Sequence, residues 1–224
     1  MLERLHAFQD LPRLRELVSI LVRHGFGEIV ARAGVGTFLE RAGELLNAGQ
    51  DERLRQLELP VRIRLALEAM GPTFVKLGQV LSTRVDMFPP EWIAEFEHLQ
   101  YDVGPAPADE MIAAMTESLG APPDKVFRDF DPRPFAAASI AQVYRAKLED
   151  GTPVVLKVRR PGIRKIIEAD LRILSSLAAV AERELPELQR FQPVQMIAQF
   201  GKSLGRELDL AMEARHQDRF AHNF

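Results

Sequence analysis

A short apolar hairpin at 135–157 constrains the fold of this chain more than any other stretch. Two runs of strand-forming residues flank the dipeptide Asp150-Gly151, which tolerates the positive φ angles of a tight turn between antiparallel strands. The second run ends on Lys157, between Leu156 and Val158, so an amine is expected on a strand too apolar to be solvated on both faces. Since a buried charge needs a partner, we expect a phosphate or a carboxylate nearby.

The spacing around this hairpin matches that of a nucleotide-binding loop. Protein kinases carry G-x-G-x-x-G-x-V before the hairpin and V-A-I-K after it. Here the first pattern reads Ala136-x-Ala138-x-x-Ala141-x-Val143, the second reads Val154-Val155-Leu156-Lys157, and alanine replaces each glycine. Because alanine avoids the positive φ angles by which glycine brings backbone N–H groups onto phosphates, we expect a stiffer loop that holds a triphosphate differently.

Strand alternation predicts which side chains meet a ligand. Ala141 and Val143 fall on one face of the first run, and Val155 and Lys157 fall on one face of the second run. We therefore expect one small ligand to touch all four side chains.

The alanine-rich loop, the lysine strand and the motif Lys76-Leu77-Gly78-Gln79 together resemble the UbiB family of atypical kinases, also called ABC1 or ADCK. The resemblance covers nearly the whole chain. It implies that Lys76 and Gln79 lie on a helical extension that closes over the nucleotide site, with Lys76 as a catalytic residue. It also implies a set of nucleotide-contacting residues in the lobe, namely Ala136, Ala137, Ala138, Ser139, Ala141, Val143, Val155 and Lys157.

A kinase lysine of this kind needs a helix carboxylate to hold it against the phosphates. The family pattern E-x-D-x-x-x-E-A maps onto Glu207, Asp209 and Glu213. The resemblance implies that Glu213 pairs with Lys157, and that Glu207 and Asp209 act with Lys76 or with a metal near the phosphates. Because Glu213 lies about 56 residues beyond Lys157, we expect a helical insertion between them.

Helical periodicity predicts a mostly helical chain around the hairpin. Pro72 is expected to begin a helix on which Lys76, Gln79, Thr83 and Asp86 form one polar stripe. Short helices are expected within 11–46, longer helices at about 109–119, 163–185 and 194–220, and a first strand at 126–130.

Other charged groups have a plainer interpretation. His24 is expected to be a helix cap or a surface group rather than a ligand. Glu168 and Asp170 repeat the E-x-D spacing, but we expect them to be surface charges. A solvated face is also favoured over lipid contact for the amino-terminal arginines, which are Arg13, Arg15, Arg23, Arg32 and Arg41.

The residues His216, Asp218 and Asn223 fit the catalytic-loop pattern H-x-D-x-x-x-x-N. We reject this match because it begins three residues after Glu213, and one helix cannot form both walls of a cleft. No D-F-G follows, so the aspartate that holds magnesium in kinases is not in this sequence.

Composition disfavours or excludes several kinds of partner, chemical site and targeting segment. The net charge of -3, with both signs interleaved, does not favour nucleic acid as a partner. The sequence contains no cysteine, which excludes disulfides and thiolate chemistry. No signal peptide is expected, and no window approaches the roughly 18 apolar residues that span a bilayer.

The sequence thus predicts a mostly helical α+β chain. A helical extension at 1–123 is expected to pack on a kinase-like amino-terminal lobe at 124–224, with the carboxyl-terminal lobe absent. We expect part of an atypical kinase or ATPase, inactive by itself, that binds ATP or ADP with magnesium held mainly by the absent lobe. The resemblance implies a role in ubiquinone or other isoprenoid-lipid metabolism, in the cytoplasm or at the inner face of a membrane. The alternative is a non-catalytic scaffold whose helices bind a lipid or a protein.

Overall fold

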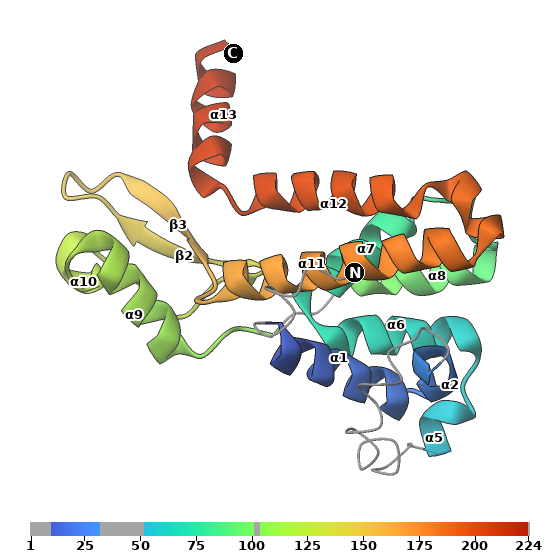
Figure 1. The fold of residues 1–224 in the computed structure, drawn as a ribbon. Helices are drawn as coiled ribbons and strands as arrows, with labels where there is room; N and C mark the ends of the chain where they lie inside the picture. The colour runs from blue at the N-terminus through green and yellow to red at the C-terminus, as the bar shows by residue number, and fades with distance from the viewer. Residues whose placement is uncertain (1–9, 32–51, 101–103, 224) are drawn as a thin grey trace. The chain divides into compact units, whose positions relative to one another are not determined.

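The computed structural model describes residues 10–31, 52–100 and 104–223. The described part is mostly helical and contains a three-stranded antiparallel sheet, as the α+β prediction requires. Two compact units group residues that are distant in sequence (Figure 1): Met1–Tyr101 with Ile167–Ala198, and Asp102–Ile166 with Gln199–Phe224. We call these unit 1 and unit 2. They are not the two domains proposed from the sequence, whose division near 123 stays a prediction.

Unit 1 is helical. Its elements before residue 101 are α1 (Leu11–Arg23), α2 (Gly27–Val30), α5 (Glu52–Arg55), α6 (Leu59–Met70), α7 (Pro72–Leu81), α8 (Pro90–Glu97) and the 3-10 turn η2 (His98–Gln100). Pro72 begins α7 as expected, since proline at the first helical position lacks only an N–H that the helix does not use. Gly71 connects α6 to α7 with φ of 96°, a conformation that favours glycine.

The main core of unit 1 joins four helices. Leu17 and Ile20 of α1 pack with Met70 of α6, Phe74 of α7 and Ile173 of α11. A second apolar cluster lies between α7 and α8, where Val75, Phe96 and Leu99 are buried. The helix that carries the Lys76 motif therefore contributes buried residues to both apolar clusters.

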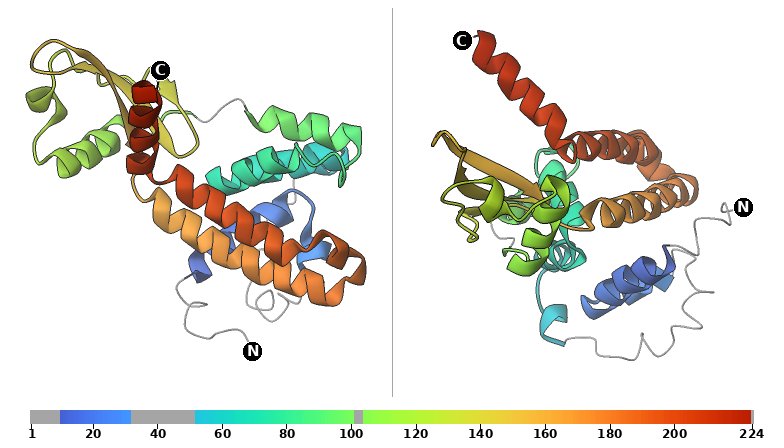
Figure 2. Two further views of the ribbon diagram at one scale, coloured as in Figure 1. Left: turned by 90° about the horizontal axis from the view of Figure 1, so that it is seen from above. Right: turned by 90° about the vertical axis from the view of Figure 1, so that its left-hand side faces the viewer.

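Two long helices pass from one unit to the other. They are α11 (Ile163–Glu184) and α12 (Pro193–Glu207), joined by the 3-10 turn η3 (Pro186–Phe191). They run antiparallel, as Figure 2 shows. Glu182 stabilises the turn, because its carbonyl accepts a hydrogen bond from Gln189 and its carboxylate accepts the N–H of Val194. This pair is the helical insertion expected between Lys157 and Glu213.

Unit 2 holds the sheet, with strand order β1-β2-β3. Met111 and Met115 of α9 cover one sheet face, where they meet the buried Tyr144 and partly buried Leu156 and Val158. The elements of this unit besides the ends of α11 and α12 are α9 (Ala108–Leu119), α10 (Pro123–Val126), β1 (Ala136–Ala137), β2 (Ala141–Lys147), β3 (Pro153–Arg159) and α13 (Leu210–Asn223).

Three expected elements are wrong in their extent. The strand at 126–130 is replaced by α10 and a single bridge between Arg128 and Lys147, because Pro122 and Pro123 favour a helical start instead. The helix at 194–220 breaks between α12 and α13, and α13 leaves in a new direction (Figure 1). The polar stripe is also cut short, since α7 ends at Leu81 and Thr83 and Asp86 lie beyond it.

Of the charged residues expected at the surface, one is buried and another is partly buried. Asp170 is fully buried in α11, and the Arg13 side chain is only 15% exposed. Local sequence did not reveal this burial, because it arises from packing among α1, α7 and α11. His24 does cap α1, with Nδ1 at 2.7 Å from the carbonyl oxygen of Ile20. Arg15 and Arg23 are exposed as expected, whereas Arg32 and Arg41 lie outside the described residues.

No helix in the described part of the chain is long and apolar enough to cross a membrane.

Candidate functional site

The hairpin formed by β2 and β3 brings the four predicted ligand-contacting side chains to one face of the sheet. Val143 pairs with Lys157, and Arg145 pairs with Val155. Cross-strand partners share a face of an antiparallel pair, and so do alternate residues of one strand. Ala141, Val143, Val155 and Lys157 therefore lie on one face, as the strand alternation predicted.

This face of β3 is open to solvent in the described structure. Val155 is 63% exposed, and the side chain of Lys157 is 41% exposed. The expected desolvation of Lys157 is therefore wrong, because α9 covers only the opposite face of the sheet, where Leu156 and Val158 lie. A half-exposed amine beside an apolar strand surface leaves room for a ligand.

Lys157 is held by Glu213, the partner that the family pattern implied. The Nζ atom donates to both carboxylate oxygens of Glu213, each at 2.7 Å. The two residues are 56 positions apart, and both side chains are about two-fifths exposed. This ion pair joins β3 to the first turn of α13.

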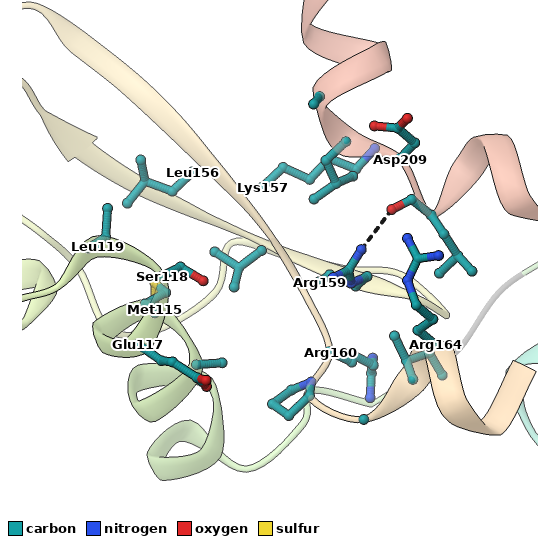
Figure 3. Close-up of a pocket in the computed structure, with 18 of the residues that line it drawn as sticks. Met115, Glu117, Ser118, Leu119, Leu156, Lys157, Arg159, Arg160, Arg164 and Asp209 are labelled. Carbon is teal, nitrogen blue, oxygen red and sulfur yellow. Dashed lines mark hydrogen bonds between the residues drawn. The ribbon is translucent and has the colours of Figure 1, made fainter.

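The junction between α12 and α13 sets the position of Glu213. Asp209 lies in the break, and its Oδ1 accepts the N–H of Met212 at 3.0 Å, which satisfies a donor at the start of α13. Arg159 donates from Nη1 to the carbonyl oxygen of the buried Leu208 at 2.9 Å (Figure 3). Arg159 and Lys157 therefore attach alternate positions of β3 to this junction. The sequence analysis missed Arg159.

The alanine-rich segment forms a tight turn between β1 and β2. The N–H of Ala138 donates to the carbonyl oxygen of Ala141 at 2.8 Å, with Ser139 and Ile140 at the tip. The alanines of the turn have no positive φ angle, so they avoid the conformations that glycine makes accessible. The stiffness expected of this loop stays a prediction.

Arg160 forms hydrogen bonds with backbone carbonyl groups of this turn. Its N–H donates to Ile140, and its guanidinium donates to the carbonyl oxygens of Ala138 at 3.1 Å and Gly104 at 2.6 Å. Partial burial lowers the pKa of Arg160 from its ordinary value, although the hydroxyl of Tyr144 acts in the opposite direction. The sequence analysis did not single out Arg160, because nothing in its spacing indicated the carbonyl oxygens that it binds.

A cavity of about 810 Å³ runs along β3, between α9 and the start of α11 (Figure 3). Its apolar wall includes Met115, Leu119 and Leu156. Positive charge is concentrated near Lys157, and Glu117 and Asp209 contribute acidic groups. The basic residues of the lining are Lys157, Arg159, Arg160, Arg164 and Lys165. The charge balance of this lining suits an anion.

The Lys76 motif lies on α7 in unit 1. Gln79 donates from Nε2 to the carbonyl oxygen of Leu99 at 3.0 Å. A Cβ atom added at Gly78 would clash with Cδ1 of Leu99, so glycine permits Leu99 to lie close to α7 at this position. The closure of Lys76 and Gln79 over a nucleotide stays a prediction.

The remaining candidates lie at or near the junction of α12 and α13. Glu207 is the last residue of α12, and Asp209 follows within the break. Among the described residues, no group of three or more histidine or acidic side chains is arranged to hold a metal ion. The rejected catalytic-loop match lies on α13, where His216 and Asp218 are exposed.

Comparison with known proteins identifies the family. Residues 98–224 match the family described as ABC1 atypical kinase-like domain. The chain is 38% identical over 216 residues to "Probable protein kinase UbiB" of Aliivibrio salmonicida, and 38% identical over 220 residues to the protein of that name from Aeromonas salmonicida. Each alignment covers 96% of this chain and 40% of the relative. The protein of that name from Marinobacter nauticus is 42% identical over 163 residues, which are 73% of this chain and 30% of the relative.

The chain thus spans about 40% of the length of these relatives. The match to the family covers the sheet, the lysine strand and α13, and the relatives extend the similarity across the helices of unit 1. This chain belongs to the UbiB/ABC1 family of atypical kinase-like proteins.

Proposed function

We propose that this chain is the nucleotide-binding portion of a UbiB-like atypical kinase or ATPase. In this proposal Lys157 holds the phosphates of ATP or ADP, and Glu213 orients Lys157. The turn at 136–141 lies over the phosphates, while Val143 and Val155 contact the base. Lys76 and Gln79 close the site, and Glu207 and Asp209 act near the phosphates.

The pair between Lys157 and Glu213 is the observation that carries the proposal. An ion pair with this exposure contributes about 0 to 1 kcal/mol to the free energy of folding. Its contribution to stability is therefore too small to account for the pair. Its geometry instead keeps an amine beside the open face that carries Val143 and Val155. A lysine held by a helix carboxylate is the arrangement that kinases use to position phosphates.

The activity of the whole protein is part of the same proposal. The relatives are named as probable protein kinases, and phosphoryl transfer or ATP hydrolysis is the activity that we assign to the full-length protein. Magnesium would neutralise phosphate charge when bound, and we assign its ligands mainly to residues beyond this chain. We place the protein in the cytoplasm, at the inner face of a membrane, in support of ubiquinone or other isoprenoid-lipid synthesis. The isolated chain is expected to lack phosphoryl transfer.

Nucleotide-dependent thermal stability tests the proposal in the full-length protein. ATP or ADP at about 100 times its dissociation constant should add ~2.7 kcal/mol to the free energy of unfolding and therefore raise Tm. Lys157→Ala should abolish this rise, and Glu213→Gln should reduce it. Lys147→Ala is the control on the same hairpin, because Lys147 forms a more exposed ion pair, with Asp129.

A wild-type protein whose Tm is unchanged by ATP and ADP would contradict the nucleotide proposal. That result would favour the alternative of a non-catalytic scaffold that binds a lipid or a protein partner.

A further inference from the structure

A buried carboxylate in α11, that of Asp170, is hydrogen-bonded to the first turn of α7, the helix that carries Lys76. Asp170 is fully buried, and both of its oxygens accept hydrogen bonds. Arg13 donates from Nε to Oδ1 at 2.7 Å and from Nη2 to Oδ2 at 3.2 Å. Thr73 donates from its hydroxyl to Oδ2 at 2.6 Å. Asp170 therefore links α1, α7 and α11 at one point.

Arg13 also binds the last residue of α6. Its Nη2 atom also donates to the carbonyl oxygen of Met70 at 2.5 Å, and Nη1 donates to Glu16 at 2.7 Å. Burial disfavours the charged guanidinium, but the hydrogen bonds to Asp170 and Glu16 outweigh it, so the pKa of Arg13 is raised above its ordinary value. The Met70 carbonyl needs such a donor, because Gly71 departs from helical geometry directly after it.

Both sides of the bend between α6 and α7 are thus bound to side chains from other helices. Met70, before Gly71, accepts from Arg13, and Thr73, after Pro72, donates to Asp170. Thr73 is itself fully buried, so its hydroxyl has an obligatory partner rather than an optional one. The direction in which α7 leaves the bend is set by these two contacts.

The other end of α7 is fixed independently. Gln79 donates to Leu99, and Gly78 lets the side chain of Leu99 lie against the helix. Lys76 lies between the two anchors, three residues after Thr73 and three before Gln79. Its position therefore depends on contacts at Thr73 and Gln79.

We propose that Asp170 is a positioning residue that acts through Thr73 and Arg13 to orient the helix carrying Lys76. This inference rests on the proposed function, in which Lys76 closes the nucleotide site. A buried ion pair is often no more stabilising than apolar residues of the same volume, so stability alone does not account for it. Defining one geometry for the bend is the role that this network can perform and an apolar cluster cannot.

The test uses Thr73→Val in the full-length protein, because valine keeps the shape of threonine and replaces its hydroxyl with a methyl group that cannot donate a hydrogen bond. The dissociation constant for ATP should rise about tenfold, and the same change in a Lys76→Ala background should alter it less than about twofold. Asp170→Asn should act in the same direction as Thr73→Val. Thr73→Ser should restore wild-type affinity, and Thr83→Val is the matched control, because the exposed Thr83 hydroxyl bonds only locally, to Val80.

Two results would overturn the inference. One is wild-type affinity in Thr73→Val, and the other is an equal loss of affinity with and without Lys76, which would indicate a general structural role. The rate at which an amine-reactive ester acylates Lys76, followed by mass spectrometry, is a readout that needs no nucleotide. It should change in Thr73→Val and not in Thr83→Val.

The acylation measurement separates this inference from the proposed function. If the wild-type protein binds no nucleotide, the proposed function fails, while a changed acylation rate still supports the positioning of Lys76. An unchanged rate in Thr73→Val would overturn the positioning role even in a protein that binds ATP.

Discussion

Gly78 and Gln79 are neighbours in a motif that the family resemblance assigns to nucleotide closure, yet both act on Leu99 in this structure. Gln79 binds its carbonyl oxygen, and Gly78 makes room for its side chain. Leu99 is buried with Val75 and Phe96, so these contacts join α7 to the turn η2. Two of the motif residues therefore have a packing role in this structure.

Gly78→Ala tests this packing role. The added methyl group would meet Leu99 on one side and Leu67 on the other, so we expect a loss of about 1 to 3 kcal/mol in the free energy of unfolding. Urea denaturation measures this change. Gly205→Ala is the control, since Gly205 lies in α12 with open space where a Cβ would lie, and alanine there should stabilise the helix by up to about 1 kcal/mol. A neutral Gly78→Ala would show that Leu99 moves aside without cost.

The hairpin was the element that sequence predicted best. Asp150-Gly151 forms the turn, with Gly151 at φ of 88° and Asp150 accepting the N–H of Thr152. Such turns depend on residues adjacent in sequence, so short-range patterns are sufficient. The register then follows from the turn, and it places Val143 opposite Lys157.

The contacts behind the alanine-rich turn were not predictable in the same way. Arg160 follows a strand and precedes a proline, and its spacing gives no indication of the carbonyls that it reaches on Ala138 and Gly104. The same reason explains the errors at Arg13 and Asp170, which look like ordinary helix charges until α1 and α11 pack together. Charge patterns report local solvation, and burial depends on partners distant in sequence.

Arg160→Lys tests whether this arginine stiffens the turn. Lysine keeps the positive charge but lacks the planar fork that reaches two carbonyl oxygens at once. We expect faster hydrogen exchange at the amide of Ala138 and a loss of about 1 kcal/mol in stability. Arg133→Lys is the control, because Arg133 is 87% exposed and pairs only with the nearby Asp131 among the contacts described. Equal exchange rates in both variants would contradict a stiffening role for Arg160.

At the scale of the whole molecule, the segment that matches the family does not have the same boundaries in sequence as the two compact units. The match begins at residue 98, whereas α11 depends on residues that precede it. Ile173 of α11 is buried among Leu17, Met70 and Phe74, and Asp170 binds Arg13 and Thr73. The matched segment alone would therefore expose an apolar stripe and an unpaired carboxylate on α11.

A fragment of residues 98–224 should consequently be less soluble than the 224-residue chain, and it should bind a hydrophobic dye that the longer chain does not bind. Ile173→Ser gives opposite effects in the two forms. In the fragment it removes part of the exposed apolar stripe and should improve solubility, measured by sedimentation. In the longer chain it places a hydroxyl in the core and should cost about 2 to 5 kcal/mol of stability. If Ile173→Ser either improved both the solubility of the fragment and the stability of the longer chain, or lowered both, the dependence of α11 on unit 1 would be wrong. The expected reversal follows because one side chain is core in one form and surface in the other.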